Sequence, residues 1–307
     1  MHPAWSVIVF TTVAGAAQGL VVALALATLF GVPLASSFVD AALIVALVML
    51  AVGLASSFLH LGHPLRAWRA VAMWRTSWLS REVIILPAFI AVVAAWWLAQ
   101  RVGVSAPWLP LLAIVASALL WYCTAMVYAC IRFIQEWAHA LTVVNYTLIG
   151  LASGLVLAAA LAVLGSQPAL ARSLVPWALA LTLLAWALRM AALRRNAALK
   201  LKSNLQSATG IRSSKLVQKS MGMSAGSFNT REFFHGASAA AVRHIRLALH
   251  GLGFGLPALL LLAVLLGAPL GLLLLALLVQ AIGLLAERWL FFAQARHPQN
   301  LYYQTVS

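Results

Sequence analysis

Two ionisable residues, His60 and Glu82, flank one short polar segment of an otherwise apolar sequence. An imidazole donates hydrogen bonds and titrates near neutral pH, and a carboxyl group gives up and takes up protons. A lipophilic quinone needs such partners, because its carbonyl oxygens accept hydrogen bonds and its reduction consumes two electrons and two protons. We therefore interpret His60 and Glu82, with the adjacent His63 and Arg81, as a candidate site for quinone binding and proton exchange.

Both residues also fit ordinary structural roles. Gly62 and Pro64 are typical helix-ending residues, and a histidine in a last helical turn suits the negative end of the helix dipole. Ser80 is a suitable N-cap, which would place Glu82 in the first turn of the next helix, where a carboxylate is favoured. The two residues lie near one membrane boundary on adjacent helices, but the sequence leaves open whether they face each other.

Other polar residues near this boundary fit structural roles. Arg132 and Glu136 are four residues apart, so on a helix they would form an ion pair. Glu287 and Arg288 lie near the end of an apolar stretch, where they can snorkel or pair locally. We expect no catalytic residue among them.

Neither a metal site nor a bound haem is expected in this chain. Two cysteines, Cys123 and Cys130, cannot alone hold a four-thiolate zinc site or an iron–sulfur cluster, and we interpret both as small buried hydrophobic residues. A bis-histidine haem needs two imidazoles on different helices at matching depth, and no histidine lies in the middle of an expected span. A haem-containing quinol oxidoreductase remains an alternative, which a visible spectrum tests.

The elements that must position these residues are transmembrane helices. Of the 307 residues, 64% are apolar and 8% charged, whereas a soluble domain has roughly 45–50% and about 25%. Crossing a membrane takes about 20 apolar residues, and continuously apolar runs indicate helices and not a β-barrel. We predict an all-α integral membrane protein, a single domain over residues 1–307 with eight transmembrane helices. The expected spans are residues 7–30, 41–61, 83–100, 109–133, 141–164, 174–193, 247–267 and 270–292, the first retained and not a cleaved signal peptide.

The distribution of positive charge predicts the orientation. The net charge is +15, and threading eight spans puts both termini on one side, together with eighteen of the twenty Lys and Arg residues. Only Arg101 and Arg172 fall on the other side. Because cytoplasmic loops gather cations, we expect both termini in the cytoplasm, with the excess charge facing membrane lipid and no nucleic acid as partner.

The longest polar segment, residues 194–244, is basic and too poor in apolar residues to form its own core. It predicts either a loop that lies against anionic lipid headgroups or a docking segment for a partner protein. The candidate docking residues are Arg66, Arg69 and Arg75 in the second loop and Arg231 in this segment.

Three stretches of the sequence resemble one protein family. They are His2-Pro-Ala-Trp-Ser-Val-Ile-Val-Phe-Thr-Thr, Leu59-His-Leu-Gly-His-Pro-Leu-Arg-Ala-Trp68 and Trp74-Arg-Thr-Ser-Trp-Leu-Ser-Arg-Glu82, and residues 128–137 and 227–235 add to them. Over essentially its whole length the chain resembles the membrane anchor subunits of dimethyl sulfoxide reductase-type molybdoenzymes (the DmsC family).

The resemblance implies an eight-span anchor in a bacterial cytoplasmic (inner) membrane, without a redox centre of its own. Its partners would be an iron–sulfur electron-transfer subunit and a catalytic subunit that holds molybdopterin, and an exchangeable quinone or quinol would be its substrate. In the family, a histidine and a glutamate that flank this loop are tied to quinol binding, and they match His60 and Glu82. The basic loops then become the docking surface of the iron–sulfur subunit.

The expected orientation separates the functions that the resemblance allows. The best-known members hold catalytic subunits in the periplasm, whereas the cation count here places the docking face in the cytoplasm, as in a similar anchor of a membrane-bound sulfite dehydrogenase. We therefore favour transfer of electrons from sulfite to quinone. The alternatives are a quinol-oxidising anchor of a dimethyl sulfoxide reductase-type terminal reductase and a small-solute transporter, although the polar residues gather at one face and no paired helix interruption is visible.

Overall fold

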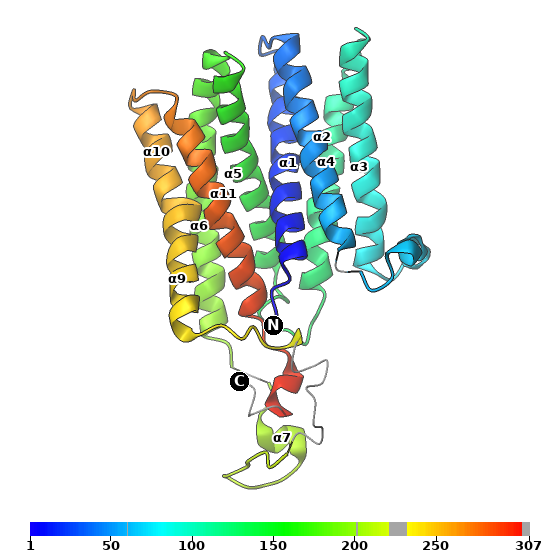
Figure 1. Ribbon diagram of the computed structural model, residues 1–307, viewed down its shortest axis with the longest axis vertical. Coiled ribbons are helices and arrows are strands. Elements are labelled where there is room, and N and C mark those ends of the chain that lie inside the picture. Colours follow the sequence, from blue (N-terminus) through cyan, green and yellow to red (C-terminus); the bar gives the residue numbers. More distant parts are fainter. Residues whose placement is uncertain (60, 201, 221–231, 303–307) are drawn as a thin grey trace.

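The computed structural model describes residues 1–59, 61–200, 202–220 and 232–302 of the chain, and the described part is a bundle of helices without strands (Figure 1). Eight of its helical units are long and apolar enough to cross a membrane, which confirms the predicted fold class. They are α1 (Trp5–Leu29), α2 (Ser36–Phe58), α3 (Trp78–Arg101), α4 (Trp108–Ala129), α5 (Ala140–Leu164), α6 (Pro168–Ala197), the continuous unit Ala239–Leu265, and α11 (Leu272–Ala293).

The sixth and seventh spans are longer than their apolar stretches. α6 begins at Pro168, a residue suited to a first helical turn, and the seventh unit begins after Ser238, whose side chain accepts a hydrogen bond from the Ala241 amide. Hydropathy marks only the length that lies in lipid, whereas a helix continues until its main-chain hydrogen bonds end. The seventh unit comprises α9 (Ala239–His250), the π-helical turn η2 (Gly251–Gly255) and α10 (Leu256–Leu265).

Glycine residues bring α1 and α5 into main-chain contact at the centre of the bundle. A Cβ atom added at Gly19 would collide with the main chain of Gly150, and one added at Gly154 would collide with the main chain of Gly19. Small residues at helix contacts allow this close approach in membrane proteins. α1 is accordingly the most extensively buried of the eight spans.

One end of the bundle carries the connecting elements, and we call it the loop end. The N-terminus, η1 (Pro64–Met73), α7 (Leu205–Thr209) and η3 (Pro298–Tyr302) lie there, and η1 lies beside α3 on the side away from α1 (Figure 1). An even number of spans explains why the N-terminus and the last described residues share this end. The side of the membrane that the loop end faces stays a prediction.

Candidate functional site

The start of α3 places Glu82 inside the bundle. Ser77 is the N-cap, because its side chain accepts a hydrogen bond from the Ser80 amide at 3.3 Å. The prediction that Ser80 caps the helix is therefore wrong, since an equally suitable serine lies three residues earlier in an extended conformation. Glu82 is the fifth helical residue and not a first-turn residue, so the helix dipole is a weak explanation for it.

The Glu82 carboxyl is buried and faces a neighbouring helix. The residue is 6% exposed, and its Oε1 accepts a hydrogen bond from the Thr124 hydroxyl of α4 at 2.5 Å. The ion pairs among the described residues do not include Glu82. A carboxyl group without a cation is costly to bury near the membrane, and such groups are typical of sites that handle protons or ions. This geometry favours a carboxyl group that holds and exchanges a proton.

Arg81 lies beside this carboxyl but binds the main chain. Its Nε and Nη2 atoms donate hydrogen bonds to the carbonyl oxygens of Trp74 and Arg75, each at 2.9 Å. The guanidinium also lies 4.1 Å from the centroid of the Trp78 ring, a cation–π distance. Trp78 in turn packs edge-on against Tyr122 of α4 at 5.3 Å. Arg81 therefore fixes the turn that leads from η1 into α3.

The histidines of the predicted site are placed differently. His60 lies outside the residues that the structure describes, so its predicted pairing with Glu82 stays a prediction. His63 is exposed and immediately precedes η1. The predicted site is therefore described at Glu82, Arg81 and His63 only.

The candidate docking residues Arg66, Arg69 and Arg75 are all exposed, the first two on η1 and the third just after it. Exposed tryptophans alternate with them: the Arg69 guanidinium lies 5.7 Å from the Trp68 ring, and that of Arg75 lies 5.4 Å from the ring of the preceding tryptophan. Tryptophan and arginine together are typical of a membrane–water interface. Arg231, the fourth candidate, lies outside the described residues.

A buried charge cluster at the same end was not predicted. Glu287 of α11 forms ion pairs with the Arg189 Nε of α6 at 2.8 Å and with the Arg288 Nε at 3.3 Å. All three residues are at most 3% exposed. Local pairing of Glu287 with Arg288 is confirmed, but the sequence carries no signal that Arg189 joins them. Their position within apolar stretches was the available hint, since charges there are rarely left unpaired.

Two structural predictions near the end of α4 are wrong. α4 ends at Ala129 and residues 131–139 form turns, so Arg132 and Glu136 have no helix to bring them together. Glu136 instead pairs with the Arg296 Nε at 3.2 Å. Cys123 is buried as expected, whereas Cys130 is exposed because it follows the last turn of the helix.

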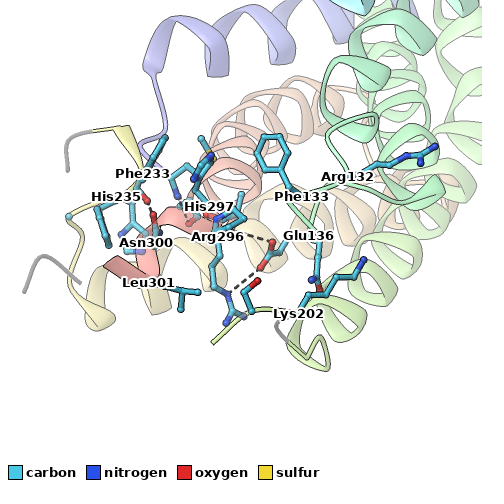
Figure 2. A pocket seen from close by; sticks show the side chains of 18 of the residues that line it. Arg132, Phe133, Glu136, Lys202, Phe233, His235, Arg296, His297, Asn300 and Leu301 are labelled. Carbon is cyan, nitrogen blue, oxygen red and sulfur yellow. Dashed lines mark hydrogen bonds and ion pairs between the residues drawn. The ribbon is translucent and has the colours of Figure 1, made fainter. Parts of the chain in front are cut away.

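A cavity of about 700 Å³ lies at the loop end, and Glu136, Arg296, His235 and His297 are among its lining residues (Figure 2). Partial burial lowers the pKa of both histidines, and the nearby Met1 amine lowers it further. No group of three or more His, Cys, Asp or Glu side chains suited to a metal ion is present among the described residues. The cavity therefore offers a charged, water-accessible space next to the buried cluster.

Comparison with known proteins gives a family match and two relatives. The family model described as "DMSO reductase anchor subunit (DmsC)" matches residues 1–293. A subunit of the sulfite dehydrogenase of Allochromatium vinosum is 48% identical over 327 aligned residues, which cover 100% of both chains. The anaerobic dimethyl sulfoxide reductase chain YnfH of Escherichia coli is 32% identical over 118 residues, which cover 37% of this chain and 41% of that protein.

Proposed function

The chain belongs to the DMSO reductase anchor subunit (DmsC) family, and from this we propose that it passes electrons from a molybdoenzyme complex to the quinone pool. As a family member it is a multi-pass membrane anchor, which agrees with the eight apolar spans. In the proposed complex, molybdopterin and iron–sulfur clusters belong to a catalytic and an electron-transfer subunit. The anchor contributes the quinone site and the attachment to a bacterial cytoplasmic membrane.

We propose sulfite as the electron donor, because the relative that matches over its full length is named as part of a sulfite dehydrogenase. Oxidation of sulfite, with the added oxygen atom taken from water, gives sulfate, two electrons and two protons. Reduction of a quinone consumes two electrons and two protons and gives the quinol. The positive charge of the predicted loops supports a cytoplasmic position for the catalytic partners.

The observation that carries this proposal is the buried Glu82 carboxyl near the membrane boundary. Among the described residues its hydrogen-bond partner is the neutral hydroxyl of Thr124, so it can exist as the carboxylic acid and donate its proton to a quinone carbonyl oxygen. Leu79 and Tyr122 are exposed on the adjoining surfaces of α3 and α4 and offer an apolar approach from lipid. His60 is the proposed hydrogen-bond partner of the second carbonyl oxygen.

Replacing Glu82 by glutamine tests the proposal. Glu82→Gln keeps the shape and the hydrogen-bond acceptor but removes the exchangeable proton, so electron transfer from the reduced clusters to decylubiquinone should slow about 100-fold. Turnover of the complex with ferricyanide, a soluble acceptor, should stay normal.

The matched control is Asp40→Asn. Asp40 pairs with Arg101 at 3.4 Å. Asp40 lies near the start of α2 and Arg101 is the last residue of α3, helix ends that lie opposite the loop end, so this variant should reduce quinone like the wild type. Normal quinone reduction by Glu82→Gln would exclude Glu82 from the site.

A further inference from the structure

We propose that a hydrated polar route connects the Glu82 carboxyl with the large cavity at the loop end and supplies the protons for quinone reduction. The inference rests on the proposed function of Glu82 and adds the path by which this carboxyl is reprotonated. Three cavities that share lining residues form the route.

The first step leads from Glu82 through Thr124. The Thr124 hydroxyl donates its hydrogen to Glu82, so its lone pairs are free to accept a hydrogen bond from the other side. On that side lies a small cavity of about 20 Å³, lined by Thr124 and by other residues of α1, α4, α5 and α11. A polar cavity of this size holds a water molecule.

Within the described ranges, several buried polar atoms in the wall of this cavity lack a hydrogen-bond partner that water could supply. Among the residues that the structure describes, Thr12 Oγ1, Gln18 Oε1, Trp121 Nε1 and the Tyr146 hydroxyl are buried without a hydrogen-bond partner. All four residues line this cavity. Buried polar groups in native proteins are nearly always paired, with ordered water where no protein group is available. We therefore place water between Thr124 and Tyr146.

The second step leads past Tyr146 and Arg288, which line both the first cavity and a second cavity of about 10 Å³. The Glu287 carboxylate and Asn145 belong to its wall, and the Asn145 Oδ1 and Arg189 Nη2 atoms lack partners within the described part of the chain. Glu287 forms ion pairs with both arginines, which holds a carboxylate at the midpoint of the route.

The third step leads to solvent. Glu136 lines the second cavity and also the 700 Å³ cavity at the loop end, where Figure 2 shows it paired with Arg296. For each quinone reduced, two electrons come from the iron–sulfur partner and two protons are taken up, one at each carbonyl oxygen, with Glu82 as the donor to the oxygen that it faces. After each donation, a proton moves from the large cavity along water and hydroxyl groups to the carboxylate.

Replacing Tyr146 by phenylalanine tests the route. Tyr146→Phe removes the hydroxyl shared by both small cavities, so in the intact complex the reduction of decylubiquinone should slow several-fold. The ratio of rates in H₂O and D₂O should rise, because proton delivery becomes limiting. Binding of an alkyl-hydroxyquinoline N-oxide should stay normal, because the quinone site itself is untouched.

The matched control is Thr182→Val. Thr182 Oγ1 is also buried without a hydrogen-bond partner among the described residues, but Thr182 lines none of the three cavities described, so its loss of a hydroxyl should change neither rate nor isotope ratio. A wild-type rate and isotope ratio for Tyr146→Phe would overturn the route. If Glu82→Gln slows quinone reduction but Tyr146→Phe does not, the result supports the quinone site and contradicts the proton route.

A second measurement does not depend on turnover or on assembly of the variants. Hydroxyl-radical footprinting labels side chains next to bound water, so Trp121, which lines the first cavity, should be labelled rapidly in the wild-type complex. Trp137 is equally buried, at 4% exposed, but its Nε1 donates to the Phe291 carbonyl oxygen at 3.0 Å, so it should stay unlabelled. Equal protection of both tryptophans would contradict a hydrated cavity.

Discussion

At the residue scale, the sequence indicates Glu82 as the candidate carboxyl group of the site but not what surrounds it. Glu82 stands out because a carboxylate is rare at an apolar boundary, and the structure places it inside the bundle. Its partner Thr124 could not be predicted, because contacts between helices depend on their rotation and packing. The same limit hid the pairing of Arg189 with Glu287, which are almost a hundred positions apart.

His60 carries the residue-scale prediction. If its imidazole donates a hydrogen bond to a quinone carbonyl oxygen, His60→Ala should weaken binding of an alkyl-hydroxyquinoline N-oxide about tenfold, the loss of roughly one hydrogen bond. Fluorescence quenching of this inhibitor measures the affinity. His244→Ala, at an exposed position on α9, should bind like the wild type, and equal affinities for the two variants would remove His60 from the site.

At the scale of elements, the eight spans were predictable because each is a continuous apolar run, and the structure confirms all of them. Their ends were less predictable: α6 and the seventh unit extend into polar sequence, whereas α4 stops at Ala129. That early end separates Arg132 from Glu136. The helical segment η1 was expected only as a loop, because its short run of mixed residues has no clear apolar stretch.

The basic side of η1 carries the second prediction. If Arg69 and Arg75 dock an iron–sulfur subunit, the double change Arg69→Glu and Arg75→Glu should release that subunit into the soluble fraction, because like charges would then face each other. Immunoblots of washed membranes measure the release. Arg172→Glu is the control, because Arg172 is exposed near the start of α6, a helix end that lies opposite the loop end. Full retention of the partner by the double variant would exclude docking at η1.

For the whole molecule, the family membership confirms the resemblance that the motifs indicated, and the single bundle agrees with an anchor. The large cavity at the loop end could not be predicted, because residues 132–136, 233–237 and 293–301 approach one another only after the bundle has formed. The orientation rests on the charge count alone.

Reporter fusions test that orientation. A phosphatase that is active only in the periplasm should be inactive when fused after Ser307 or within residues 203–224, and active when fused near Ser105. The reverse pattern would place the docking face in the periplasm and favour the arrangement of a quinol-oxidising terminal reductase.

The glycine contact between α1 and α5 has a consequence for the proposed route. Gly15 and Gly150 belong to the wall of the first small cavity, and Gly19 and Gly154 close the seam one turn further along. In the proposed route, main-chain atoms, which cannot change rotamer, therefore set the space that is available to water between α1 and α5. An alanine at Gly19 or Gly154 would push the two helices apart, because its Cβ atom would collide with the facing main chain. It would thereby change the hydration of the cavity without altering any ionisable group.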